Sequence, residues 1–178
     1  LTYMGTPVLS ALAPPPGGPS PEPSKQLSDP RELLEGYLDH YREEILRKLD
    51  GFPEPEVSRV PSGWTPVSML KHLAYMERRW FVWDFAGEQV EDPWSDRDED
   101  DLLVADESFE EIKDFYLAQC ERSRQAVAGA GLSDVASRIG RFQPPEEPPT
   151  LAWIMFHVLE EYMRHAGHLD IARELAES

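Results

Sequence analysis

Four helix-start signals, each followed by apolar residues three and four positions apart, are the feature that most restricts how this chain can fold. The side chains that can cap the four helices are Asp29, Thr65, Ser108 and Thr150. Proline directly follows the first two caps, at the first helical position, where its missing N–H is not needed. No segment alternates between apolar and polar residues for long enough to build a sheet. The sequence therefore predicts an all-α fold, a four-helix bundle.

The predicted helices are joined by connections of unequal length. The helices run from residue 30 to 49, from 66 to the stop at Gly87, from 109 to the glycine at 129, and from 151 almost to residue 178. The connections after the second and third helices are long, each on the order of twenty residues, whereas up-and-down bundles use a handful. We expect at least one of them to cross the length of the bundle. The first contains EQVEDPWSDRDEDD, which we interpret as a solvated acidic loop.

The N-terminal 28 residues differ in composition from the rest of the chain. Pro, Gly and Ser are frequent there, which disfavours a helix, and the few apolar groups cannot offset the entropy lost on ordering. We expect a flexible Pro/Gly-rich tail over residues 1–28. Residues 29–178 are then one bundle domain, since 40% of the 178 residues are hydrophobic, enough for a single core.

The charge and the cysteine content limit the partners and the compartment. A formal net charge of -17 argues against nucleic acid as a partner, because binding to phosphate backbones depends on clustered Lys and Arg. No run of about eighteen apolar residues is present, so no membrane association is expected. The single cysteine, Cys120, excludes an intramolecular disulfide and favours a cytoplasmic location. We interpret Cys120 as a small core residue of the third helix.

Most of the histidines fall on one face of the last predicted helix, in the segment HVLEEYMRHAGHLD. At roughly 100° per residue, His157, Glu161, His165 and His168 lie within about 80° of one another, in the sector that also carries the apolar residues. These four side chains are therefore predicted to point inward, whereas Glu160 lies at the edge of the stripe or outside it. Gly167, in the same segment, suggests either a close backbone approach or access for a ligand.

The second predicted helix carries a further inward histidine, His72, among apolar side chains. A buried carboxylate without a partner costs several kcal/mol, so something must compensate Glu161. One solution is a polar network in which a protonated histidine pairs with Glu161. The other is a metal ion, because a Glu and a His four residues apart lie on adjacent turns and a facing His can supply a third ligand. Spacing alone leaves both open.

The segments GWTPVSMLKHLAYMERRWF and HVLEEYMRHAGHLD together resemble the DinB superfamily of four-helix-bundle metalloenzymes, over roughly residues 30–176. Within it, the chain looks most similar to a subgroup related to mycothiol-dependent enzymes such as maleylpyruvate isomerase. The usual superfamily triad is one His on the second helix and two His four residues apart on the fourth. Here Glu161 replaces the first of that last pair, a departure that the maleylpyruvate isomerases share.

Carried over residue by residue, the resemblance implies His72, Glu161 and His165 as metal ligands, with His157 and His168 in supporting or substrate-binding roles. It also implies that the third helix runs parallel to the second. The expected metal is Zn²⁺, although two His and one carboxylate also suit Fe²⁺, Ni²⁺ or Mn²⁺.

The implied function is a metal-dependent S-transferase or isomerase whose cosubstrate is a low-molecular-weight thiol and whose second substrate is a small electrophile. Two alternatives stay open at this point. One is a metal-dependent hydrolase. The other is a non-catalytic bundle, monomeric or a homodimer, in which the inward His and Glu side chains form a structural network.

Overall fold

Each of the four helices begins where the sequence predicts. The computed structural model describes residues 20–178, and its long helices are α1 (Pro30–Leu49), α2 (Pro66–Glu77), α3 (Phe109–Val127) and α4 (Leu151–Ala176). The side chains that accept hydrogen bonds from the first turns are the four predicted caps, Asp29, Thr65, Ser108 and Thr150. Residues 20–178 contain two isolated β-bridges and no strand, which confirms the all-α prediction.

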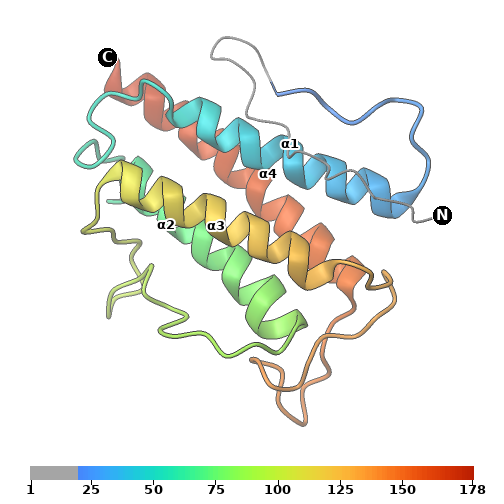
Figure 1. Ribbon diagram of the computed structural model, residues 1–178. Helices are drawn as coiled ribbons and strands as arrows, with labels where there is room; N and C mark the ends of the chain where they lie inside the picture. Colours follow the sequence, from blue (N-terminus) through green and yellow to red (C-terminus); the bar gives the residue numbers. More distant parts are fainter. Residues whose placement is uncertain (1–19) are drawn as a thin grey trace, which may run out of the picture.

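The helices run in two parallel pairs (Figure 1). α1 packs on α4 and α2 on α3, and α2 also contacts α4. Nζ of Lys71 donates to Glu107 over 2.8 Å, which joins the beginnings of α2 and α3. Nη2 of Arg173 donates to the carbonyl of Lys48 over 2.7 Å, which joins the ends of α1 and α4. The parallel course of α2 and α3, implied by the resemblance, is therefore present, and residues 86–108 return along the bundle as the connection between them.

The second helix departs from the regular helix that the sequence predicts. After Glu77 the chain continues as a π-helical segment, η1 (Arg78–Phe85). It ends with a hydrogen bond from the N–H of Ala86 to the carbonyl of Phe81, five residues back, and Gly87 follows with φ of 72°. The wider turns rotate the side chains of η1 relative to those of α2. Segments of this kind occur often at functional sites.

A charged network crosses the centre of the bundle. The carboxylate of Glu77 is fully buried and accepts hydrogen bonds from Nε and Nη2 of Arg42, at 2.8 and 2.9 Å. The hydroxyl of Tyr162 also donates to Glu77, over 2.7 Å, and the hydroxyl of Tyr116 donates to that of Tyr162 over 3.0 Å. The network therefore ties α1, α2, α3 and α4 together within the apolar core.

The long connection between α3 and α4, residues 128–150, packs on η1. The buried carboxylate of Asp84 accepts hydrogen bonds from the backbone N–H and from Nε of Arg141, at 3.0 and 2.8 Å. Gly140 lies so close to η1 that a Cβ there would come within 2.5 Å of Oδ1 of Asp84. Both long connections are thus present as predicted, and this one is fixed to the bundle by specific contacts.

Most of the predicted N-terminal tail, residues 1–19, lies outside the described residues. Residues 20–28 contain no helix, and the division into tail and bundle domain stays a prediction. Among the residues that the structure describes, no helix combines the length and apolar character needed to cross a membrane.

Candidate metal centre

Three of the side chains singled out in the sequence converge between α2 and α4. His72 comes from α2, and Glu161 and His165 come from adjacent turns of α4. One possible ligand atom of each lies within 4.8 Å of the others. The imidazole rings of His72 and His165 are 5.1 Å apart, nearly perpendicular, and both are buried. The packing of α2 on α4 thus assembles the three groups that the resemblance implies as ligands.

The donor atoms of these three residues suit a divalent cation. Nε2 of His165 lies 3.2 Å from Oε2 of Glu161. Two ligand atoms held at about 2.0–2.2 Å on one tetrahedral ion lie about 3.3–3.6 Å apart, so this pair needs little movement to share an ion. Two imidazoles and one carboxylate match the donors of Zn²⁺ sites that keep an open position. The assignment of these residues as ligands stays a prediction.

Asp96 fixes the orientation of His72. Oδ2 of Asp96 lies 2.9 Å from Nδ1 of His72, and because a carboxylate only accepts hydrogen bonds, Nδ1 carries the proton. In the neutral ring, Nε2 of His72 is then the nitrogen with a free lone pair. Metal-binding histidines are commonly held in this way by a carboxylate on the other ring nitrogen.

Arg79 in turn fixes Asp96. Its guanidinium donates to both carboxylate oxygens, at 2.6 and 3.0 Å, and to the carbonyl of Pro93 over 2.8 Å. The indole of Trp94 stacks on the guanidinium, 4.5 Å from its central carbon. Asp96 has no exposed surface, so the interpretation of its connection as a solvated loop is wrong at this residue.

The surroundings of the site keep the carboxylate of Asp96 charged and the imidazole of His165 neutral. Burial acts to raise the pKa of Asp96, but the hydrogen bonds from His72 and Arg79 outweigh it, and the pKa lies below its ordinary value. Burial, followed by the proximity of His72, lowers the pKa of His165 to about 4. His165 is therefore neutral near pH 7 and has a lone pair for a cation.

His168 and His157 lie on opposite sides of the three converging residues along α4. Nδ1 of His168 lies 3.3 Å from Nδ1 of His165, where it can orient that ring. The ring of His157 stacks on Trp153, at 5.0 Å and 12°, and meets Trp80 edge-on at 4.7 Å. These contacts are consistent with supporting roles, which stay predictions.

The second carboxylate oxygen of Glu161, Oε1, accepts a hydrogen bond from Arg164. Nη1 of Arg164 donates to Oε1 of Glu161 over 2.6 Å and the same guanidinium pairs with Glu160, which is more exposed than Glu161, as predicted. Even so, ligand atoms of His157, Glu160 and Glu161 lie within 4.8 Å of one another. Glu161 therefore presents one oxygen to the histidines and the other to Arg164.

Three residues around the centre were not predicted from the sequence: Asp96, Arg79 and Arg164. Arg79 is seven residues after His72, so helical periodicity alone places it on the same face. Asp96 gives no comparable signal, because it is one of many acidic residues in its connection and its burial depends on the path of that connection across the bundle. Arg164 has the spacing of an ordinary exposed ion pair with Glu160.

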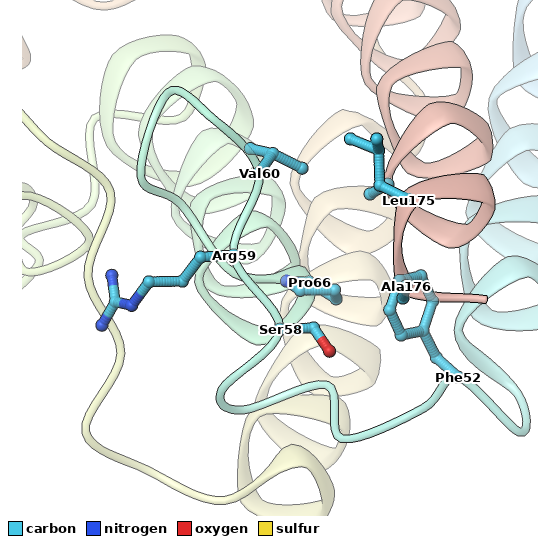
Figure 2. Close-up of a pocket in the computed structure, with 8 residues that line it drawn as sticks. Phe52, Ser58, Arg59, Val60, Pro66, Leu175 and Ala176 are labelled. Carbon is cyan, nitrogen blue, oxygen red and sulfur yellow. The ribbon is translucent and has the colours of Figure 1, made fainter. Parts of the chain in front are cut away.

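A cavity of about 220 Å³ lies elsewhere, between the α1–α2 connection and the end of α4 (Figure 2). Its walls include Phe52, Val60, Pro66 and Leu175, with the side chain of Arg59 directed away from Leu175. None of the three converging residues lines it. The candidate metal centre and this cavity are therefore separate features.

Comparison with known proteins adds to this geometry. No curated protein matches the chain. A family model described as mycothiol-S-transferase matches residues 33–178, which include all four helices apart from the first turn of α1 and every residue of the candidate metal centre. The match extends over most of the chain and over both histidine-bearing segments, and on this basis the chain belongs to the mycothiol-S-transferase family.

Proposed function

We propose that this protein is a metal-dependent S-transferase that joins a low-molecular-weight thiol, mycothiol, to a small electrophile. The observation that carries the proposal is the convergence of His72, Glu161 and His165 from two helices. Membership of the mycothiol-S-transferase family implies the thiol and the class of reaction. The donor set supports a metal as the group that makes the thiol reactive.

The residues of the chain prepare the site for a cation. Asp96 holds the proton of His72 on Nδ1 and so leaves Nε2 free. Burial keeps His165 neutral near pH 7, and Glu161 supplies the negative charge. A divalent cation bound to these three residues would favour the thiolate form of the cosubstrate and hold its sulfur beside the electrophile. Zn²⁺ is the first choice, and Fe²⁺, Ni²⁺ and Mn²⁺ suit the same donors.

The reaction balances without an oxidant or reductant. The thiol loses its proton to solvent, and its sulfur forms a bond to the electrophilic carbon. The bond from that carbon to the leaving group breaks, and the leaving group departs with the electron pair. An isomerase would use the same first bond, with the thiol expelled again after the substrate has rearranged.

Metal retention provides the first test. Protein purified without chelator or affinity tag, then offered Zn²⁺, Ni²⁺, Mn²⁺ or anaerobic Fe²⁺, is expected to retain one of these ions stoichiometrically. Glu161→Gln and His165→Ala are expected to lose the ion with the helical circular dichroism intact. Glu160→Gln is the matched control, because Glu160 lies next to Glu161 but belongs to the more exposed side of α4. Equal retention by Glu160→Gln and Glu161→Gln would exclude the ligand assignment.

Activity provides the second test. Metal-loaded protein with mycothiol and a generic electrophile is expected to form the thioether faster than mycothiol alone, and His165→Ala is expected to abolish this acceleration. Cysteine or glutathione at the same concentration measures the preference for the thiol. Stoichiometric metal without acceleration for any of the thiols would favour the non-catalytic bundle.

A further inference from the structure

An aromatic surface borders the candidate metal centre on α4. We define it by four rings, Trp80 of η1, Phe142 of the α3–α4 connection, and Trp153 and His157 of α4, and name it the aromatic shelf. The ring of Trp80 lies 6.0 Å from Phe142, 5.6 Å from Trp153 and 4.7 Å from His157. Trp80 of η1 is distant in the sequence from the other three residues, so two separate parts of the chain contribute to one cluster.

The shelf reaches the metal centre at its inner end. His157 precedes Glu161 by one turn of α4, and a ring nitrogen of His157 lies within 4.8 Å of a carboxylate oxygen of Glu161. At the opposite end, Trp153 is one further turn away from Glu161. A molecule of the size of one substituted ring that lies along the shelf can therefore place an atom beside the centre.

The shelf is held in place before any ligand arrives. The guanidinium of Arg141 covers the ring of Trp80 at 4.2 Å, and the buried carboxylate of Asp84 holds Arg141 through its N–H and Nε. Trp80 itself belongs to the π-helical segment, which is a type of irregularity common at functional sites. Little side-chain entropy remains to be lost when a ligand binds.

Trp80, Arg141 and Phe142 have a structural role, because they pack the α3–α4 connection against η1. Trp153 has no comparable role. The Trp153 side chain stacks flat on His157, at 12° between the rings, and yet the residue is 52% exposed. An indole of this kind, fixed by a stacking partner and open to solvent, offers a flat apolar contact for a ligand.

The chemistry of the shelf selects the ligand. Indole faces are electron-rich, so they stack best with a planar, electron-poor ring. Arg141 is already paired with Asp84, and Glu160 and Glu161 lie at the inner end, so a negatively charged group gains little there. We propose that the aromatic shelf binds the electrophilic substrate and that this substrate is a neutral, planar, electron-poor aromatic or conjugated compound. That the bound compound is a substrate rests on the proposed S-transferase function. Its binding to the shelf can be measured without any activity.

Binding without chemistry is the first experiment. 1,3-Dinitrobenzene is planar and electron-poor but has no leaving group, and calorimetry with metal-free protein measures its dissociation constant. Trp153→Ala is expected to raise this constant about tenfold, and Trp153→Phe to restore part of the affinity. Phe156→Ala is the control, since Phe156 is an aromatic residue of α4 that is more exposed than Trp153 and lies outside the shelf. An unchanged dissociation constant in Trp153→Ala would overturn the proposal, whether or not the protein proves to be a transferase.

Substrate discrimination is the second experiment. With metal-loaded protein and mycothiol, Trp153→Ala is expected to raise KM about tenfold for 1-chloro-2,4-dinitrobenzene, with little change in kcat. For iodoacetamide, a small aliphatic electrophile, both constants are expected to stay within twofold of wild type. An equal loss for the two electrophiles would assign Trp153 a general structural role and overturn the proposal.

Discussion

The carboxylate of Asp96 lies 2.9 Å from Nδ1 of His72, and the two residues are 24 positions apart in the sequence. The contact exists because the α2–α3 connection returns along the bundle to reach the beginning of α3. Arg79, which lies in η1 directly after α2, donates to both carboxylate oxygens of Asp96 and so holds Asp96 in place. A connection that would serve only as a linker in a shorter bundle thus supplies a buried charge to the candidate metal centre.

Asp96→Asn is predicted to weaken metal binding about 10- to 100-fold, as does the loss of other groups that orient a metal-binding histidine. The amide no longer carries the charge that holds the proton on Nδ1 of His72, and Arg79 loses its buried partner. Titration of metal-free protein with Zn²⁺, with a competing chromophoric chelator, measures the affinity.

Asp100→Asn is the control for this substitution, because Asp100 lies on the same connection and is exposed. Its affinity is expected to match wild type. Circular dichroism must show that Asp96→Asn is folded at the temperature of the titration, since a buried arginine without its partner costs about 3 kcal/mol or more. A folded variant with wild-type affinity would show that Asp96 does not orient a ligand.

The bundle can be predicted well from the sequence because the signals for each helix lie within or directly beside that helix. Caps such as Thr65 and Ser108, and apolar residues every three or four positions, lie within one or two turns of what they determine. His72, Glu161 and His165 could be placed on inward faces by the same periodicity. Asp96 could not, because its position depends on the path of a connection without regular structure, and the π-helical turns of η1 leave no mark in the apolar spacing.

Glu77→Gln is predicted to lower the free energy of unfolding by about 3–5 kcal/mol. The substitution keeps the shape of the side chain but leaves the buried guanidinium of Arg42 without the carboxylate that binds it twice. Urea unfolding followed by circular dichroism measures the change. Glu88→Gln, which removes an exposed pair with Arg122, is the comparison and is expected to cost less than about 1 kcal/mol. Similar losses for both variants would mean that the central network contributes no more than a surface pair.

Cys120 is predicted to make the protein less stable in alkali. Burial, followed by the nearby charge of Glu77, raises the pKa of the thiol from 9.0 to about 12. The folded state therefore holds this proton more tightly than the unfolded state does. The resulting stability is fully present below about pH 9 and is lost as the pH rises toward 12, at up to about 1.4 kcal/mol per pH unit.

Comparison with Cys120→Ala isolates the contribution of this thiol. Tyr116 and Tyr162 also have raised pKa values, chiefly through burial, and they add the same kind of pH dependence to both proteins. The difference in free energy of unfolding between wild type and variant is expected to decrease between pH 9 and pH 10.5. A constant difference over that range would show that the buried thiol does not retain its proton.

Gly167→Ala is predicted to stabilise the protein by about 0.5–1 kcal/mol, because alanine is the better helix former. The sequence suggests either a close backbone approach or access for a ligand at this position. In the structure a Cβ there would meet no atom within 4 Å beyond the neighbouring residues and backbone of α4 itself, so no close approach is present. Gly140→Ala is the opposite case, since its Cβ would lie 2.8 Å from the Cα of Asp84, and it is expected to destabilise. Thermal unfolding of the two variants measures both changes. A loss of stability in Gly167→Ala would mean that a partner chain or a ligand covers this part of α4 in solution.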